Sequence, residues 1–252
     1  MKLLLMLMFT AMPTVVANAQ ASSQSYEVPM EISVRDFDQD VSDVWGEVRK
    51  MIKASRFESD LDDYNVAIAN HDPQQAQEAL DKMVRDFPES AKQEPLAIKF
   101  HQATIYFWKK DFSGCYKLMD ETLRTMEQKY PKGIPADHKY AEQNKRFMSQ
   151  LYFGRGAAAM HLGKYNIAVA DFTKAIAVYK PLGYMYGNKS RALFLLKKYK
   201  EAAEAYDMAY LITPEWALNA PDRKVLCATF KESGINPKAC QSEEKDKSSN
   251  LK

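Results

Sequence analysis

The segment Gly163-Lys164-Tyr165-Asn166-Ile167-Ala168 returns 34 positions later as Lys197-Lys198-Tyr199-Lys200-Glu201-Ala202. The same offset relates Phe172 to Tyr206 and Ala175 to Ala209. Within each copy the matched residues lie three or four positions apart, which places them on one face of a helix. A period of this size predicts stacked structural units, in which alanines admit a neighbouring helix and aromatic rings fill the remaining space.

Each copy also carries the signals of an earlier helix and of a helix end. Tyr152, Gly156 and Ala159 share one face of a preceding helix, and their small members suit a close helix crossing. Pro181 and Pro214 follow the second helix of each copy, where proline cannot continue a helix. The unit therefore reads as helix, turn, helix.

This pattern resembles the tetratricopeptide repeat (TPR) family, and more narrowly an exported bacterial TPR-containing protein. The resemblance covers residues 57–216; it is strong in the last two copies and weaker in two earlier ones, which run through Tyr64 and Ala76 and through Ala103 and Cys115. It implies an all-α fold, an α-solenoid of about four TPR-like helix-turn-helix pairs with an N-terminal extra helix and a C-terminal capping helix. The expected repeat core is Gly156, Tyr165, Ala168, Phe172, Ala175, Tyr199, Ala202, Tyr206 and Ala209.

Family members use the concave side, lined by the first helix of each pair, to hold a peptide or a helix. Projecting helix positions gives a row that is aromatic and apolar, with Arg191 as its firm positive charge. The family's carboxylate clamp of Lys, Arg and Asn is not met by this row, so an apolar or amphipathic segment is the expected ligand. The predicted partner-binding groove is Phe100, Thr104, Phe107, Phe153, Ala157, His161, Tyr184 and Arg191.

The two ends of the chain have their own signals. Residues 1–19 read as a signal peptide, because Lys2 precedes an apolar run and Ala17-Asn18-Ala19 is a small-x-small cleavage site. A flexible segment is expected over 20–37 and an amphipathic helix over 38–56. Beyond the repeats we expect a capping helix and loop over 217–240 and a disordered tail over 241–252. After cleavage no membrane span is expected, and the predicted location is the periplasm, with secretion as the alternative.

Export changes the interpretation of the three cysteines. Cys227 and Cys240 lie 13 positions apart on either side of a turn at Ile235-Asn236-Pro237, and in an oxidising compartment we expect them to form a disulfide. The alternative is two independent buried thiols. Cys115 falls at a small core position and is expected to stay unpaired.

The sequence contains none of the common motifs for catalysis, metal binding or phosphate binding. The four histidines do not pair with each other or with cysteine at metal-ligand spacing, and no nucleophile elbow or phosphate loop is present. A net charge of +2 with no basic stripe gives no reason to expect nucleic acid. We therefore expect no catalytic residues, no metal and no cofactor, and a protein or peptide as partner.

The function expected from these signals is a periplasmic scaffold or adaptor for protein–protein interaction. A regulator or accessory subunit of a cell-envelope enzyme is the alternative, and a catalytic domain on a repeat scaffold is the third option. The sequence leaves the partner's identity, the pathway and the oligomeric state open.

Overall fold

The computed structural model describes residues 56–241, and all the regular elements in that range are α-helices. The predicted signal peptide, the predicted flexible segment over 20–37, the predicted helix over 38–56 except its last residue, and residues 242–252 of the predicted tail lie outside the described residues. Within the described range no helix is both long enough and apolar enough to cross a membrane. The all-α class and the consecutive packing of helices agree with the prediction from the sequence.

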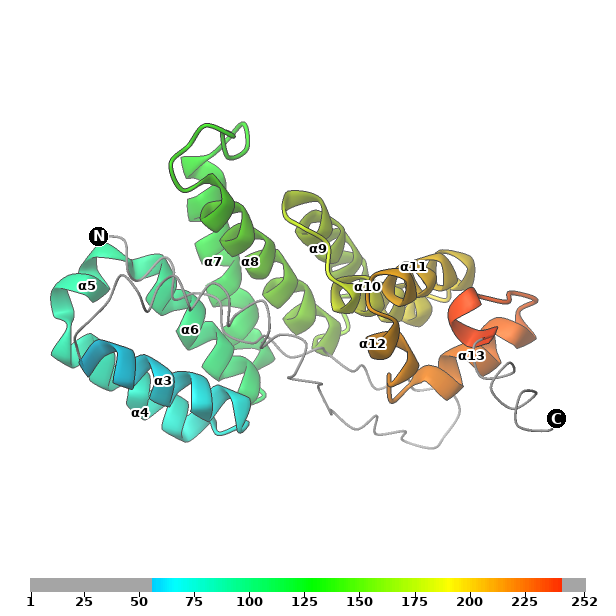
Figure 1. Cartoon of the computed structure of the whole chain (residues 1–252), viewed down its shortest axis with the longest axis horizontal. Helices are drawn as coiled ribbons and strands as arrows, with labels where there is room; N and C mark the ends of the chain where they lie inside the picture. Colours follow the sequence, from blue (N-terminus) through cyan, green and yellow to red (C-terminus); the bar gives the residue numbers. More distant parts are fainter. Residues whose placement is uncertain (1–55, 242–252) are drawn as a thin grey trace. The chain divides into compact units, whose positions relative to one another are not determined.

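The described chain divides into two compact units, one ending at Ala158 and the other beginning at Ala159 (Figure 1). The first unit holds α3 (Arg56–Ala69), α4 (Pro73–Asp86), α5 (Pro88–Gln93), α6 (Pro95–Trp108), α7 (Phe112–Lys129) and most of α8 (Ala141–His161). The second holds the end of α8, then α9 (Tyr165–Val178), α10 (Gly183–Leu195), α11 (Tyr199–Ile212), α12 (Pro214–Leu218) and α13 (Arg223–Glu232).

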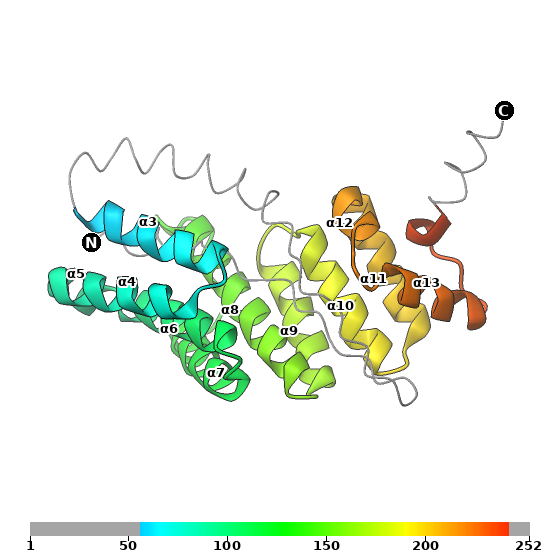
Figure 2. The same cartoon turned by 90° about the horizontal axis from the view of Figure 1, so that it is seen from below.

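Helices that follow one another in the chain pack side by side in each unit. In the first unit α3 packs on α4 and α6 on α7, and in the second α10 packs on both α9 and α11 (Figures 1 and 2). The extra residues between the second and third repeats lengthen the helices on each side of a proline-containing turn. Thus α7 has 18 residues and α8 has 21, against 14 in α9.

Four turns join first to second helices, and all four use the same backbone geometry. One residue in each turn has a positive φ, and the next residue donates its N–H to a carbonyl five positions back, as in a Schellman motif. The positive-φ residues are His71, Lys110, Gly163 and Lys197, with φ angles of 58°, 61°, 71° and 59°. This turn geometry recurs at all four predicted repeats, including the two whose sequence match is weak, and it also ends α13 at Gly234.

Most residues of the predicted repeat core are buried in the structure. Ala168, Phe172 and Ala175 on α9 are fully buried, as are Ala202, Tyr206 and Ala209 on α11. Gly156 is buried, while Tyr165 and Tyr199 are half-buried at the starts of their helices. Burial of each large side chain contributes about 1.5–3 kcal/mol relative to exposure. The Tyr206 hydroxyl donates to the Ala217 carbonyl at 2.6 Å, so this ring is also fixed in orientation.

Candidate partner-binding surface

The first helices of neighbouring pairs touch along the predicted row in the first unit. The Tyr64 ring of α3 meets the His101 ring of α6 edge-on at 4.7 Å, and the His71 ring meets that of Trp108 at 4.2 Å. Phe100 of α6 in turn meets Phe147 of α8 at 5.7 Å. These contacts make α3, α6 and α8 neighbours, as a row of first helices requires.

Most of the predicted groove residues are withdrawn from solvent. The buried members are Phe100, Thr104, Phe107, Phe153 and Ala157 in the first unit and Arg191 in the second, whereas His161 and Tyr184 are half-buried. Thr104 donates to the Phe100 carbonyl at 3.0 Å, and Phe107 packs against Phe112 with ring centroids 5.3 Å apart. Their role in holding a partner stays a prediction, and their present contacts are those of interior residues.

Arg191, the charge expected to meet a partner, is engaged within the chain. Its Nε and Nη2 donate to the two carboxylate oxygens of Asp222 at 2.5 Å and 2.6 Å. Burial lowers the pKa of Arg191, but the charge and hydrogen bonds of Asp222 outweigh it, so the pKa is raised overall. The guanidinium also lies 4.9 Å from the centre of the Trp216 ring.

Trp216 of α12 covers the same face of α10. A Cβ placed on Gly187 would lie 1.8 Å from the Trp216 ring, so the indole rests directly on the glycine backbone. Gly187 and Arg191 lie one turn apart on α10, and both face the segment that follows α11. The absence of a side chain at Gly187 leaves room for the Trp216 ring. The inner face of the last repeat is therefore covered by the chain's own α12 and by Asp222 at the start of α13.

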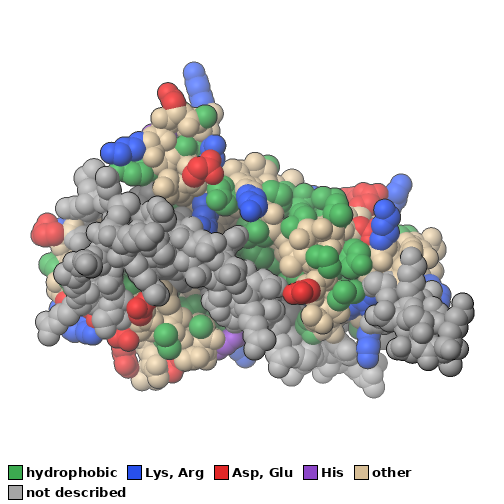
Figure 3. Space-filling view, in the orientation of Figure 1, with side chains coloured by type: hydrophobic (Ala, Val, Ile, Leu, Met, Phe, Trp, Pro, Cys, Tyr) green, Lys and Arg blue, Asp and Glu red, His purple; other side chains and the backbone are tan. Residues whose placement is uncertain are grey.

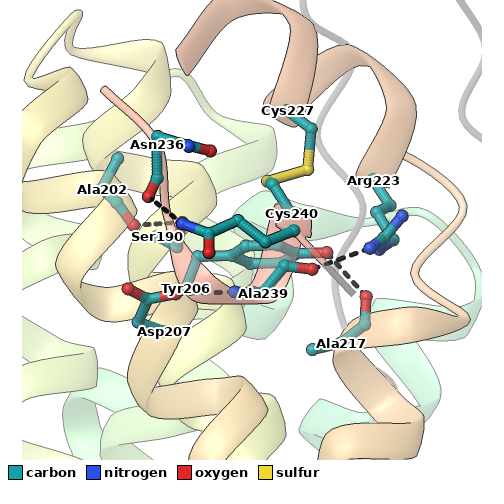
Figure 4. The surroundings of a disulfide bond; sticks show 11 residues. Ser190, Ala202, Tyr206, Asp207, Ala217, Arg223, Cys227, Asn236, Ala239 and Cys240 are labelled. Atoms are coloured by element: carbon teal, nitrogen blue, oxygen red, sulfur yellow. Dashed lines mark hydrogen bonds between the residues drawn. A yellow bond between two sulfur atoms is a disulfide. The ribbon is translucent and has the colours of Figure 1, made fainter. Parts of the chain in front are cut away.

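The segment after α13 is tied down by a disulfide and by hydrogen bonds (Figure 4). Cys227 and Cys240 are bonded, with their Cα atoms 5.6 Å apart. Beside them the Ala239 N–H donates to Asp207 at 2.9 Å, and Arg223 donates to the Ala239 carbonyl at 2.7 Å. The remaining cysteine, Cys115, is buried and unbonded, and burial raises its pKa, which makes a reactive thiolate unfavourable.

The first unit contains a buried histidine on α6. His101 is 2 % exposed, and burial lowers its pKa to about 4, so the ring is neutral at physiological pH. The Tyr64 hydroxyl, which donates to the His101 carbonyl at 3.3 Å, has its pKa raised by burial. Both groups are therefore uncharged hydrogen-bonding groups in the row.

Three polar residues on the first helices of the first unit, Asn65, His101 and Gln150, were not among the predicted groove residues, although the register of the turns identifies their positions. Counted back from the positive-φ residue of its own turn, Asn65 matches Thr104, Ala157 and Arg191, each six positions earlier. By the same count Trp108 matches His161, Gln150 matches Tyr184, and His101 matches Asn188. The signal available in the sequence was a polar side chain at one of these register positions. The predicted row was chosen for aromatic and apolar residues and so did not include it.

Among residues 56–241, no group of three or more His, Cys, Asp or Glu side chains is placed to hold a metal ion.

Comparison with known proteins gives one distant relative. No family model matches the chain, and no solved structure matches it. Over 117 residues the chain is 27 % identical to the protein called DnaJ homolog subfamily C member 7 homolog of Dictyostelium discoideum. The match covers 46 % of this chain and 19 % of the relative, so the chain spans about a fifth of that protein's length. This likeness supports TPR-like helical repeats.

Proposed function

We propose that this chain is an exported scaffold or adaptor that holds a segment of another protein against the first helices of its repeats. The observation that carries the proposal is the recurrence of one turn geometry four times, together with the adjoining first helices α3, α6 and α8 of the first unit. Stacked helix pairs of this kind provide extended surfaces for protein partners. The distant likeness to a DnaJ homolog supports the same class.

The proposed location is the bacterial periplasm. The apolar run after Lys2 and the Ala17-Asn18-Ala19 site support export, and the Cys227–Cys240 disulfide suits an oxidising compartment. Fractionation of cells making the full-length protein, with N-terminal sequencing of the product, tests this. We expect a periplasmic protein that begins at Gln20; a cytoplasmic protein with its first residues intact would contradict export.

Photo-crosslinking at matched positions tests the binding surface. In living cells a benzoyl-phenylalanine replaces Trp108 on α6 or Tyr184 on α10, which belong to first helices. The controls are Tyr116 on α7 and Tyr210 on α11, which are also half-buried aromatic residues but belong to second helices.

We expect one dominant partner from the first-helix positions and none from the controls. Its identity separates a scaffold from a regulator of an envelope enzyme, because the latter's partner has its own active site. Equal crosslinking from both helices, or none from either, would contradict the proposed surface.

A further inference from the structure

Positive charge is unevenly divided between the two compact units. Residues 159–241 contain twelve Lys and Arg against seven Asp and Glu, whereas residues 56–158 contain fifteen against sixteen. Part of this difference arises at the turns. Lys164 and Lys198 stand before the second helices of the second unit, at the positions where Asp72 and Asp111 cap those of the first. The turns of the second unit therefore carry lysine where the first unit carries a carboxylate.

Two turns of the second unit lie at one edge of its helices. The turn after α8 starts α9 at this edge, and α10, which packs on α9, returns the chain to it, where the turn into α11 follows (Figure 2). The acidic residue in these turns is Glu201, whose Oε1 lies 3.9 Å from Lys198 Nζ. The lysines exposed at the two turns are Lys164, Lys197, Lys198 and Lys200.

Apolar side chains are exposed at the same edge. Leu162 in the turn before α9 is 36 % exposed, and Ile167 in the first turn of α9 is 37 % exposed. Lysines attract anionic headgroups, and exposed aliphatic side chains leave water when they enter the headgroup region of a bilayer. A phospholipid surface offers both contacts together, because its negative headgroups border its apolar interior. The edge is therefore suited to an anionic membrane.

We propose that this edge, formed by Leu162, Lys164, Ile167, Lys197, Lys198 and Lys200 and called the basic edge below, rests on an anionic phospholipid surface. Leu162 and Ile167 enter the headgroup region, and the lysines lie against the lipid phosphates. The basic edge consists of turn residues, whereas the proposed partner surface consists of first-helix residues. The proposal thus goes beyond the adaptor function and does not depend on it.

Sedimentation with phospholipid vesicles tests the proposal on the protein purified as cells process it. The vesicles contain phosphatidylcholine alone, or equal parts of phosphatidylcholine and phosphatidylglycerol. We expect binding to the mixed vesicles only, and weaker binding as salt shortens the range of the attraction. Lys197→Gln with Lys200→Gln should weaken this binding about 25-fold, because each lysine near an anionic surface contributes about a fivefold factor.

A matched control removes the same charge from the first unit. Lys110 has a φ of 61° and Lys197 a φ of 59°, so the two residues hold equivalent places in their turns. Lys109 and Lys110 are exposed, but Asp111 follows them. Lys109→Gln with Lys110→Gln should therefore leave the affinity for the mixed vesicles unchanged. Both double variants should melt at the wild-type temperature, which separates binding from folding.

The depth of the basic edge in the bilayer is a second readout. Leu162→Cys carries an environment-sensitive fluorophore, and Val66→Cys, at a 56 % exposed position on α3, is the control. We expect the emission of the label at residue 162 to shift to the blue with mixed vesicles and that of the label at residue 66 to stay in place. Leu162→Gln should weaken binding about fivefold, since about a third of the leucine has area left to bury.

Three results would overturn the proposal. The first is no binding to the mixed vesicles, and the second is an equal loss of affinity in the two double variants, which would mean attraction by net charge alone. The third is a blue shift at residue 162 that is as large with soluble polyglutamate as with vesicles, which would make an acidic polypeptide the ligand of the basic edge. The adaptor function is tested separately by photo-crosslinking at first-helix positions.

Discussion

The second helices begin differently in the two compact units. In the first, Asp72 and Asp111 cap α4 and α7 by accepting backbone N–H groups of the first turn, at 3.0 Å and 2.8 Å. In the second, Lys164 and Lys198 stand at the same place and provide no side-chain cap. The second helices whose sequence matches the repeat pattern well therefore begin without a side-chain cap. Those whose match is weak have a capping bond worth about 1 kcal/mol.

The pairing of buried polar side chains can also be compared between the two units. Among the described residues, both units hold a buried amide oxygen without a hydrogen bond on a first helix, Asn65 Oδ1 on α3 and Asn188 Oδ1 on α10, and the second also pairs the buried Arg191 with Asp222. On the face of the molecule seen in Figure 3, apolar side chains gather over the second unit, where Leu211 is 72 % exposed. Unpaired buried polar atoms thus occur in both units, and the bidentate Arg191–Asp222 pair belongs to the second.

Removing Asp222 should have the largest effect and should act through the second unit. Asp222→Ala leaves the buried Arg191 guanidinium without its carboxylate, and we expect a loss of about 3–5 kcal/mol in the free energy of unfolding. Urea unfolding followed by circular dichroism measures it. The double variant Arg191→Met with Asp222→Leu should recover most of the loss, because apolar side chains need no charge partner. A loss below about 1 kcal/mol in Asp222→Ala would show that the pair is not buried in solution.

The Cys227–Cys240 disulfide should be the next largest contribution, again confined to the second unit. Its residues are 13 positions apart, and closing a loop of this size stabilises a fold by about 3 kcal/mol in the chain-entropy model. Replacing both cysteines with serine should lower the free energy of unfolding by that order. Reducing agent should destabilise the wild type and not the variant. Free thiols at Cys227 and Cys240 in the purified protein, detected by alkylation and mass spectrometry, would contradict the bond.

The spacing of small and aromatic residues predicted the repeat core, because residues three or four positions apart must share a helix face. That is why Ala168, Phe172 and Ala175 could be placed from sequence. The engagement of Arg191 could not, because its partner Asp222 lies 31 positions away. Nothing local indicates that the chain returns onto α10. The pairing of Gly187 with Trp216 is hidden for the same reason.

The positions of the polar side chains on the first helices of the first unit were predictable from the sequence, but their hydrogen bonding was not. The turn register assigns Asn65 and Gln150 to the inner face, yet a sequence cannot show whether an amide there has a hydrogen-bond partner. That property depends on the side chains of neighbouring helices. Repeat geometry is thus set by local spacing, whereas the hydrogen bonding of buried side chains is set by contacts between helices.

Acid should weaken the first unit through His101. The pKa of this ring is lowered to about 4 in the fold, against 6.5 for an ordinary histidine, so the unfolded chain takes up the proton first as the pH falls. The contribution of neutral His101 to the free energy of unfolding is therefore fully present above pH 6.5. It decreases between pH 6.5 and 4, and the free energy of unfolding then falls by up to about 1.4 kcal/mol per pH unit.

Urea unfolding at steps across this window measures the slope, and His101→Gln should reduce it. The reduction is partial, because burial also lowers the pKa of His161 to about 4. An unchanged slope in His101→Gln would mean that the ring is hydrated and titrates as an ordinary histidine.

The turns should give the smallest effects and the most direct comparison between repeats. A left-handed backbone costs a side-chain-bearing residue about 1–2 kcal/mol, whereas glycine adopts it freely but loses more conformational entropy on folding. Lys110→Gly in the first unit and Lys197→Gly in the second should therefore each raise the free energy of unfolding by about 0.5–1 kcal/mol, and Gly163→Lys should lower it by a similar amount. His71→Gly should gain less, because the His71 ring packs on Trp108 and that contact would be lost. If Lys110→Gly were destabilising, the positive φ there would not describe the turn in solution, and the equivalence of the four turns would fail at the second repeat.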